Sequence, residues 1–341
     1  MSHLPKKLKI AVSVGKGLLA LAFLVYLIAT IQKDSGFTRL LHEPKQWPYI
    51  LLALGMVLVA FSNSFVRWYL LVRGLDLDFQ LRDAFRLGSL GFMLSQVMPG
   101  SVGGDLFRAA FIAHEQPGRR TLAVASVFID RVVGLVAMLV VASLGLIVAG
   151  KTVQMGPLIR SLQTFVWLAT VGGIGALLVM ASPLASGEKV QSCLQKIPGV
   201  GHLLHQLSAG LANFRSRRRY LVAAFILAIL THSLLVGAFW CLGRGLPIDE
   251  PTFPQTVSIV PLAFVAGGLP LTPGGLGLFE SGLAKLFGTI GLQESDGAMV
   301  ALGYRALTYA MAVIGACYYF TAKKRYDELL IEAESLAGEV E

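Results

Sequence analysis

VVGLVAMLVVASLGLIVAG, residues 132–150, carries no charge and approaches the roughly 20 apolar residues that a helix needs to cross a bilayer. Of the 341 residues in the chain, 55% are hydrophobic and only 14% are charged, whereas a soluble domain has about 25% charged residues. The sequence therefore predicts an all-α integral membrane protein. Further apolar runs lie at 17–31, 48–65, 165–181, 220–242 and 306–322.

The distribution of Lys and Arg predicts the topology. With the N-terminus in the cytoplasm, basic residues concentrate in the cytoplasmic segments 73–86, 114–120 and 183–219, as the positive-inside rule requires. We therefore expect a multi-pass protein of the cell inner (cytoplasmic) membrane with both termini cytoplasmic. The net charge of +9 then reflects topology and attraction to anionic lipid, and we predict no nucleic-acid partner. The expected spans, about six in all, are 11–31, 48–72, 121–149, 162–182, 220–243 and 297–321.

Two apolar stretches, 84–113 and 254–290, are interrupted in the middle by Pro and Gly. In a six-span topology each must enter and leave on the same side, so we interpret them as re-entrant broken hairpins that enter from opposite sides. The alternative is two short spans for each stretch, which gives eight or more helices. Broken backbone at membrane depth persists only where protein or water covers it, so the hairpins should lie inside the bundle.

The two halves of the chain share a pattern. The first hairpin turns at residues 99–103 (PGSVG) and the second at 273–277 (PGGLG), and an arginine follows 32 positions after each proline, Arg131 and Arg305. This order predicts one transmembrane domain, 1–325, made of two inverted repeats at about 1–155 and 160–325, followed by an acidic cytoplasmic tail at 326–341. Inverted repeats with broken helices are typical of secondary transporters. The alternative is that the turns are only structural kinks.

Charged residues within the apolar segments are costly, at about 2.5–3.5 kcal/mol each near the bilayer centre. Asp105 and Arg108 are three positions apart, so on a helix they share a face and can pair. Asp130 and Arg131 are adjacent and must find separate partners. For each such residue, a structural ion pair and a contact with substrate are both open interpretations. The charges in or beside apolar segments are Arg67, Asp105, Arg108, Asp130, Arg131, Glu280, Lys285 and Arg305.

We expect the glycines at both turns to open helices. A helix N-terminus offers free N–H groups and a partial positive charge, and glycine lets an anion approach the backbone. Glycine also serves close helix packing in membranes, and this alternative stays open. We expect the glycines to donate N–H groups, the arginines to neutralise a headgroup, and Asp105 and Glu280 to orient the arginines or carry protons. The candidate substrate-binding residues are Gly103, Gly104, Asp105, Arg108, Asp130, Arg131, Gly274, Gly275, Gly277, Glu280 and Arg305.

Four segments carry a resemblance to a known family: MPGSVGGDLFRA at 98–109, Asp130-Arg131, GLPLTPGGLGLFE at 268–280 and Tyr304-Arg305. They resemble the lysylphosphatidylglycerol synthase transmembrane region, also called the flippase-like family. The resemblance implies an inner-membrane protein related to the lipid-translocating half of bifunctional lysyl-lipid synthases. Those proteins also carry a cytosolic aminoacyl-transferase domain. This chain ends about 20 residues after its last expected helix, so we expect no aminoacyl transfer from it.

The leading functional hypothesis is a transporter or flippase of an anionic, phosphate-bearing lipid. The alternatives are a membrane-embedded transferase that uses a lipid-linked donor, and a non-transporting partner subunit of an envelope lipid enzyme. The sequence contains no GxSxG, HExxH or Walker motif, so we favour a protein that is not an enzyme and expect no cofactor or metal ion. The expected partners are anionic membrane lipids, with a homo-oligomer or an envelope enzyme as further candidates.

The inverted hairpins predict a labelling pattern. Cysteines placed at Ser101 and Gly275, in a chain without its native cysteines, should both be deep in the membrane and be reached from opposite sides in different states. Impermeant thiol reagents applied separately to each side measure this. Ready labelling of both positions from one side only would show that the hairpins are not inverted.

Overall fold

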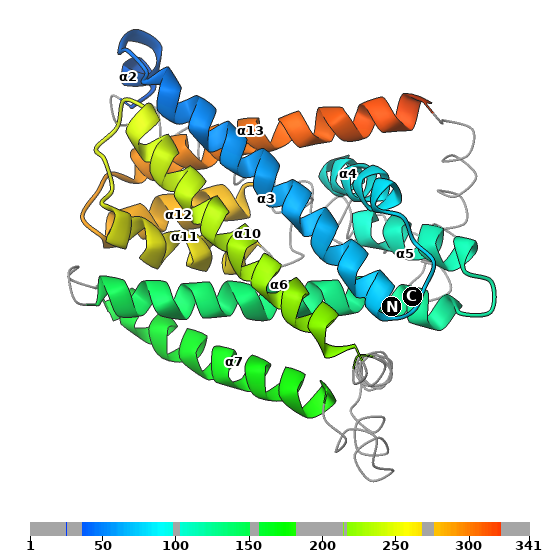
Figure 1. Ribbon diagram of the computed structural model, residues 1–341. Helices are drawn as coiled ribbons and strands as arrows, with labels where there is room; N and C mark the ends of the chain where they lie inside the picture. The colour runs from blue at the N-terminus through cyan, green and yellow to red at the C-terminus, as the bar shows by residue number, and fades with distance from the viewer. Residues whose placement is uncertain are drawn as a thin grey trace, which may run out of the picture.

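The long helices of the computed structural model confirm an all-α membrane protein. The structure describes residues 25, 36–97, 103–150, 157–181, 214, 217–267 and 276–321, and all regular elements in this part of the chain are helices (Figure 1). The expected span 11–31 lies outside these residues, apart from Val25. Within them, five helices are long and apolar enough to cross a membrane: α3 (Trp47–Gly74), α6 (Arg120–Ala149), α7 (Pro157–Ala181), α10 (Arg218–Gly245) and α13 (Glu294–Thr321).

A pair of short helices stands where each broken hairpin was predicted. The first pair is α4 (Leu81–Val97) and α5 (Gly103–Glu115), and the second is α11 (Phe253–Gly267) and α12 (Leu278–Thr289). At 1.5 Å per residue, α5 and α12 are each about 20 Å long, too short for a hydrocarbon core of about 30 Å. These lengths favour re-entrant hairpins over pairs of spans. A further short helix, α2 (Gly36–His42), precedes α3.

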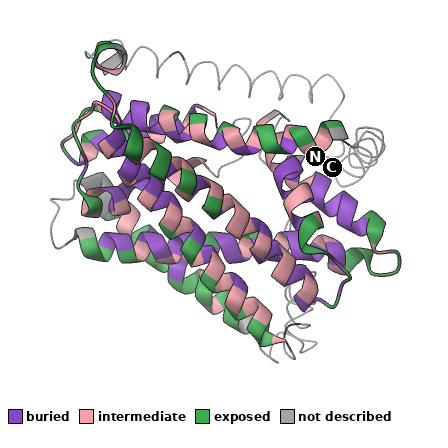
Figure 2. Cartoon of the chain, turned by 45° about the horizontal axis from the view of Figure 1, so that its top comes forward, coloured by how far each residue is buried: buried purple, intermediate pink, exposed green. Residues whose placement is uncertain are grey.

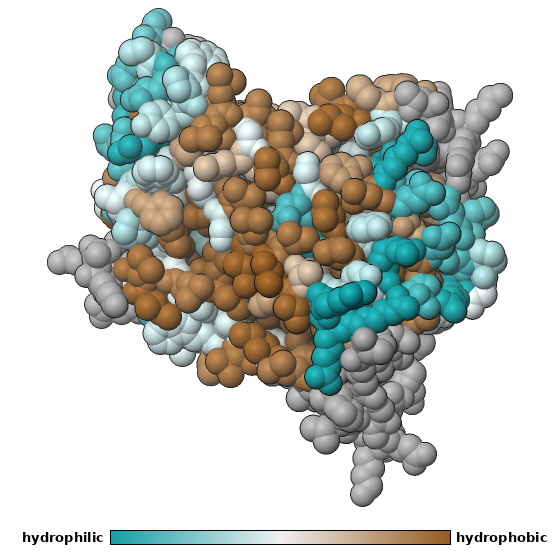
Figure 3. All heavy atoms as spheres, viewed as in Figure 1, coloured by the Kyte–Doolittle hydropathy of each residue, from teal (hydrophilic) through white to brown (hydrophobic). Residues whose placement is uncertain are grey.

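Side chains on the long helices divide into an apolar exterior and a packed interior. Figure 3 shows a broad hydrophobic band across one face, with polar residues gathered toward its ends. The exposed side chains of α7, coloured green in Figure 2, are largely apolar, among them Leu168 and Val171. An apolar surface of this extent fits contact with lipid. Both hairpins bury side chains, for example Leu87 and Phe107 in the first and Ile259 and Leu283 in the second, as their predicted interior position requires.

The packing of the second hairpin mirrors that of the first. Helix α3 packs along α10, while the two hairpins lie toward opposite ends of α6 (Figure 1). Helix α4 packs against α13 of the other half, and α11 packs against α6 of the other half. This reciprocal arrangement agrees with the predicted inverted repeat, whose boundaries at about 155 and 160 remain a prediction.

A glycine brings two backbones together at each of these crossings. Gly315 of α13 lies against the Ser89 carbonyl of α4, and a Cβ at this glycine would collide with that oxygen. Gly145 of α6 lies equally close to the Val257 carbonyl of α11. The Val257 carbonyl also lacks its usual helical hydrogen bond, because the residue four positions later is Pro261, which has no N–H. Close approach of the halves therefore depends on glycine at both crossings.

Replacement of Gly315 by alanine should destabilise the fold. The added methyl group meets backbone rather than a flexible side chain, so α13 and α4 must separate, at a cost of about 1–3 kcal/mol. Thermal unfolding of the purified protein in detergent micelles measures the effect. The control is Gly55→Ala, because an added Cβ there meets nothing within 4 Å. Equal melting temperatures for the two variants would contradict the close crossing.

Candidate functional site

The centre of the candidate site is a buried carboxylate on α6. Asp130 is 2% exposed and binds the Arg67 guanidinium from α3 through two contacts, Nε to Oδ1 at 2.8 Å and Nη2 to Oδ2 at 3.1 Å. Such a fork is the strongest form of carboxylate pairing. Arg108 of α5 adds a further contact, with Nη2 at 3.5 Å from Asp130 Oδ2. The expectation that Asp130 finds its partners away from Arg131 is confirmed.

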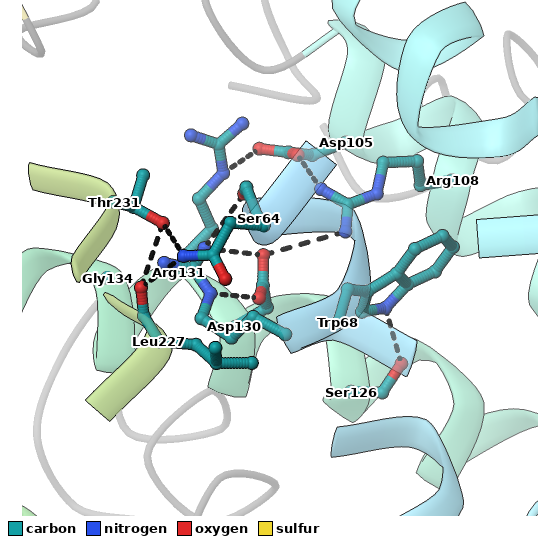
Figure 4. Close-up of polar contacts among 12 residues, drawn as sticks. Ser64, Trp68, Asp105, Arg108, Ser126, Asp130, Arg131, Gly134, Leu227 and Thr231 are labelled. Atoms are coloured by element: carbon teal, nitrogen blue, oxygen red, sulfur yellow. Dashed lines mark hydrogen bonds and ion pairs between the residues drawn. The ribbon is translucent and has the colours of Figure 1, made fainter. Parts of the chain in front are cut away.

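A second carboxylate, that of Asp105 in the first turn of α5, connects Arg108 to Arg131. It lies 3.5 Å from Arg108 Nη1, as the spacing of three positions predicted, and 2.5 Å from Nε of Arg131 on α6 (Figure 4). Arg131 therefore extends across the interface between α5 and α6 to Asp105, which follows the Pro-Gly turn of the first hairpin. Asp130 and Arg131 therefore pair with different residues, as their adjacency in the sequence predicted.

Trp68 positions Arg108 within the cluster. Its indole lies under the Arg108 guanidinium, 4.0 Å from Cζ to the ring centroid, and its Nε1–H donates to Ser126 Oγ at 3.3 Å (Figure 4). A cation held over a tryptophan face is attracted to it by about 0.5–2 kcal/mol, more where water is excluded. Arg108 Nε is buried and has no hydrogen-bond partner in the described part of the chain. The Arg108 guanidinium is therefore fixed in place, with one donor unused.

The charges of this cluster do not balance. Three guanidinium groups, from Arg67, Arg108 and Arg131, face the two carboxylates of Asp105 and Asp130. Among the residues that the structure describes, one positive charge is therefore uncompensated. The Arg131 side chain is 60% exposed, whereas those of Arg67 and Arg108 are buried. The excess charge is thus accessible at Arg131.

The corresponding ion pair of the second hairpin, between Arg305 and Glu280, is largely buried. Arg305 Nε donates to Glu280 Oε1 at 2.6 Å, and these two side chains are 13% and 1% exposed. The other carboxylate oxygen of Glu280 accepts the N–H of Gly277 at 2.7 Å. Gly277 has φ of +80°, a conformation that glycine adopts without strain. The N–H expected to bind a headgroup here therefore bonds to the protein's own carboxylate.

The model of the family described as "Lysylphosphatidylglycerol synthase TM region" matches residues 8–316. The chain belongs to this family. No curated protein sequence matches it. Membership agrees with the resemblance of the motifs at 98–109 and 268–280.

In this member of the lysylphosphatidylglycerol synthase transmembrane family, the predicted glycines have different positions. Gly103 begins α5. Gly104 lies directly against the Gly91 carbonyl of α4, where a Cβ would collide with the oxygen, so close packing explains this glycine without a ligand. Gly274 and Gly275 lie outside the described residues.

Several polar residues of the site were missing from the sequence prediction. Arg67 was recognised as a costly charge but was not assigned to the site, although an arginine inside the run 48–72 was a usable signal. Trp68 and Ser126 gave no signal, because their roles depend on tertiary contacts. Lys285 proves to be peripheral, since it is 59% exposed and pairs with Glu294 at 3.0 Å. Among the described residues, no group of three or more His, Cys, Asp or Glu is arranged to hold a metal ion.

The two matched arginines should respond differently to removal. Arg305→Ala leaves the carboxylate of Glu280 buried without its cation, which costs about 3–5 kcal/mol and should sharply lower the yield of folded protein. Arg131→Ala removes an exposed group and leaves Asp105 beside Arg108, so its folded yield should stay near that of the wild type. Size-exclusion chromatography of the expressed variants measures both.

The control is the double variant Arg305→Met with Glu280→Gln. It removes both charges and keeps an acceptor for the Gly277 N–H, so it should recover folded protein. An equal collapse of Arg131→Ala and Arg305→Ala would contradict the difference in burial.

Proposed function

We propose that the chain transports an anionic, phosphate-bearing lipid across the cell inner membrane. The observation that supports this most directly is the uncompensated positive charge at the start of α5, inside a membrane-spanning bundle. An unbalanced charge at membrane depth is costly, and functional sites are where membrane proteins keep such charges. A phosphate headgroup would supply the missing negative charge.

Arg131 is the proposed contact for the headgroup. Its Nε binds Asp105, while its two Nη atoms have no ion-pair partner within the described residues and point away from the carboxylate (Figure 4). A guanidinium presents its donors as a planar fork that matches phosphate oxygens. Asp105 therefore orients Arg131 and leaves the donors at its tip for a ligand. Arg108, held by Trp68, would supply the second positive charge.

The architecture supports translocation over static binding. Broken helices packed reciprocally between two inverted halves are the arrangement through which secondary transporters expose one site to either side of the membrane in turn. Here the cluster lies where the first hairpin meets α3 and α6, and both hairpins contact the other half through glycine crossings. We further propose that both termini are cytoplasmic, on the basis of the Lys and Arg distribution.

Reconstitution tests the proposal. In phosphatidylcholine vesicles that contain a fluorescent phosphatidylglycerol, the purified chain should accelerate movement of the probe between leaflets, read as loss of fluorescence to an impermeant quencher. Arg131→Ala should slow it about tenfold or more, because a hydrogen bond to a charged group contributes about 1.5–3 kcal/mol. Arg131→Lys should restore only part of the rate, since lysine lacks the fork.

The matched control is Arg244→Ala, which removes an arginine that is 40% exposed and paired with Glu250 at the far end of α10. It should leave the rate unchanged. Folded wild-type protein that fails to accelerate any anionic lipid would refute the proposal. Product formation from a lipid-linked donor would identify a transferase instead, and stable co-purification with one envelope enzyme would identify a partner subunit.

A further inference from the structure

A histidine in the middle of α10 has one ring nitrogen bonded and the other unused. His232 Nε2 lies 3.0 Å from the carbonyl oxygen of Gly134 on α6. A carbonyl only accepts, so Nε2 carries the hydrogen and donates it. In a neutral imidazole the second nitrogen, Nδ1, is then an acceptor. Nδ1 is buried and has no hydrogen-bond partner in the part of the chain that the structure describes.

Such an unused acceptor is uncommon and costly. Leaving a buried polar atom unpaired costs about 1–3 kcal/mol, and native proteins keep few of them without a functional reason. A polar group nearby is already engaged, because Asn63 Nδ2 donates to both Thr231 Oγ1 and the Leu227 carbonyl at 2.7 Å. His232 Nδ1 is therefore left to accept a hydrogen bond or a proton from outside this network.

Continuous contacts connect His232 to the arginine cluster. The Arg67 guanidinium packs against Gly134, so that a Cβ at this glycine would lie 3.2 Å from Arg67 Nη1. Gly134 therefore contacts both side chains: its carbonyl accepts from His232, and its Cα faces the Arg67 guanidinium. Arg67 binds Asp130, and Asp130 contacts Arg108. A new charge at His232 would act first on Arg67 and then, through Asp130, on the proposed headgroup site.

The titratable groups that can act on His232 lie on the helices packed against α10. Helix α3 presents Arg67, and α6 presents Asp130, which is bound to Arg67. Helix α11 carries no titratable residue in its sequence. On α13, Arg305 is bound to Glu280, while Tyr304 packs against Phe239, two turns of α10 beyond His232. The charge that bears on His232 is therefore that of Arg67.

We propose that His232 is a proton-binding site coupled to the arginine cluster, so that the chain moves its anionic lipid together with a proton. The inference rests on the proposed function. Protonation at Nδ1 adds a second positive charge beside a cluster that already carries one in excess. The resulting repulsion is relieved when an anion binds, so protonated His232 and bound phosphate favour each other. By linkage, each raises the affinity for the other by the same factor.

Proton coupling would supply the energy for net transport. A headgroup that carries one negative charge inward works against a potential that is negative inside, whereas a headgroup accompanied by a proton crosses in either direction without net charge. A pH gradient across the membrane could then drive lipid accumulation in one leaflet. The balance is simple: one proton binds Nδ1 as the anion binds, and both leave on the other side.

The first measurement follows the imidazole directly. Chain with ¹⁵N-labelled histidine is placed in phosphatidylcholine nanodiscs, and the ring nitrogen signals are followed between about pH 3 and 8. We expect one titrating signal that is absent from His232→Gln, a variant that keeps the donor to Gly134, and present in His114→Gln, which removes an exposed histidine of α5. Adding phosphatidylglycerol should raise the midpoint by about one pH unit, which corresponds to tenfold coupling.

The second measurement uses the fluorescent phosphatidylglycerol vesicles with a pH gradient. A gradient should drive the probe into one leaflet about tenfold above the distribution without it in wild type and His114→Gln, and His232→Gln should abolish this response. An imidazole that stays neutral throughout the pH range would overturn the proposal. A midpoint unmoved by phosphatidylglycerol, with Arg131-dependent translocation intact, would also overturn it while leaving the proposed function standing. Absence of any translocation by the folded wild type would refute the proposed function and the coupling together.

Discussion

A carboxylate buried in a membrane-spanning bundle must have a cation, and the pairing of Asp130 with Arg67 is the constraint on which the site depends. The two contacts join α6 to α3, and the further contact with Arg108 brings in the first hairpin. With Arg108 fixed, Asp105 can bridge to Arg131, and Trp68 can lie beneath the guanidinium. One buried acid thus sets the relative position of three helices and of every charged group around them.

Both hairpins pair an acidic residue of their second helix with an arginine, but the charge balance around the pair differs between them. In the second, one arginine meets one glutamate, and the same glutamate caps its helix through the Gly277 N–H, so charge and backbone are both satisfied internally. In the first, three arginines meet two aspartates, and Arg131 stays largely exposed. The two hairpins therefore hold matched ion pairs, and the charge balance is why the proposed headgroup contact is assigned to the first.

Local spacing made part of this predictable. Apolar runs near 20 residues located α3, α6, α7, α10 and α13, three-residue spacing paired Asp105 with Arg108, and adjacency required separate partners for Asp130 and Arg131. The two arginines that follow the turns at the same 32-residue interval, Arg131 and Arg305, each pair with the acidic residue that follows their own turn. Pairing across the bundle was beyond this reasoning, because Arg67 and Asp130 lie 63 positions apart and only helix packing joins them. The packing role of Gly104 and the capping role of Glu280 likewise depend on neighbours that no short interval reveals.

The charge excess of the first hairpin is the feature that supports the proposed binding of an exchangeable anion. A third carboxylate would balance the three arginines of the first hairpin, as Glu280 balances Arg305 in the second, so stability alone gives no reason for the excess positive charge of the cluster. An exchangeable anion requires such an unmatched arginine, because a site already neutral gains little from binding one. The proposed protonation of His232 at its unpartnered Nδ1 would make the strength of this site variable, because the added charge would act on Arg67 and, through it, on Asp130 and Arg108.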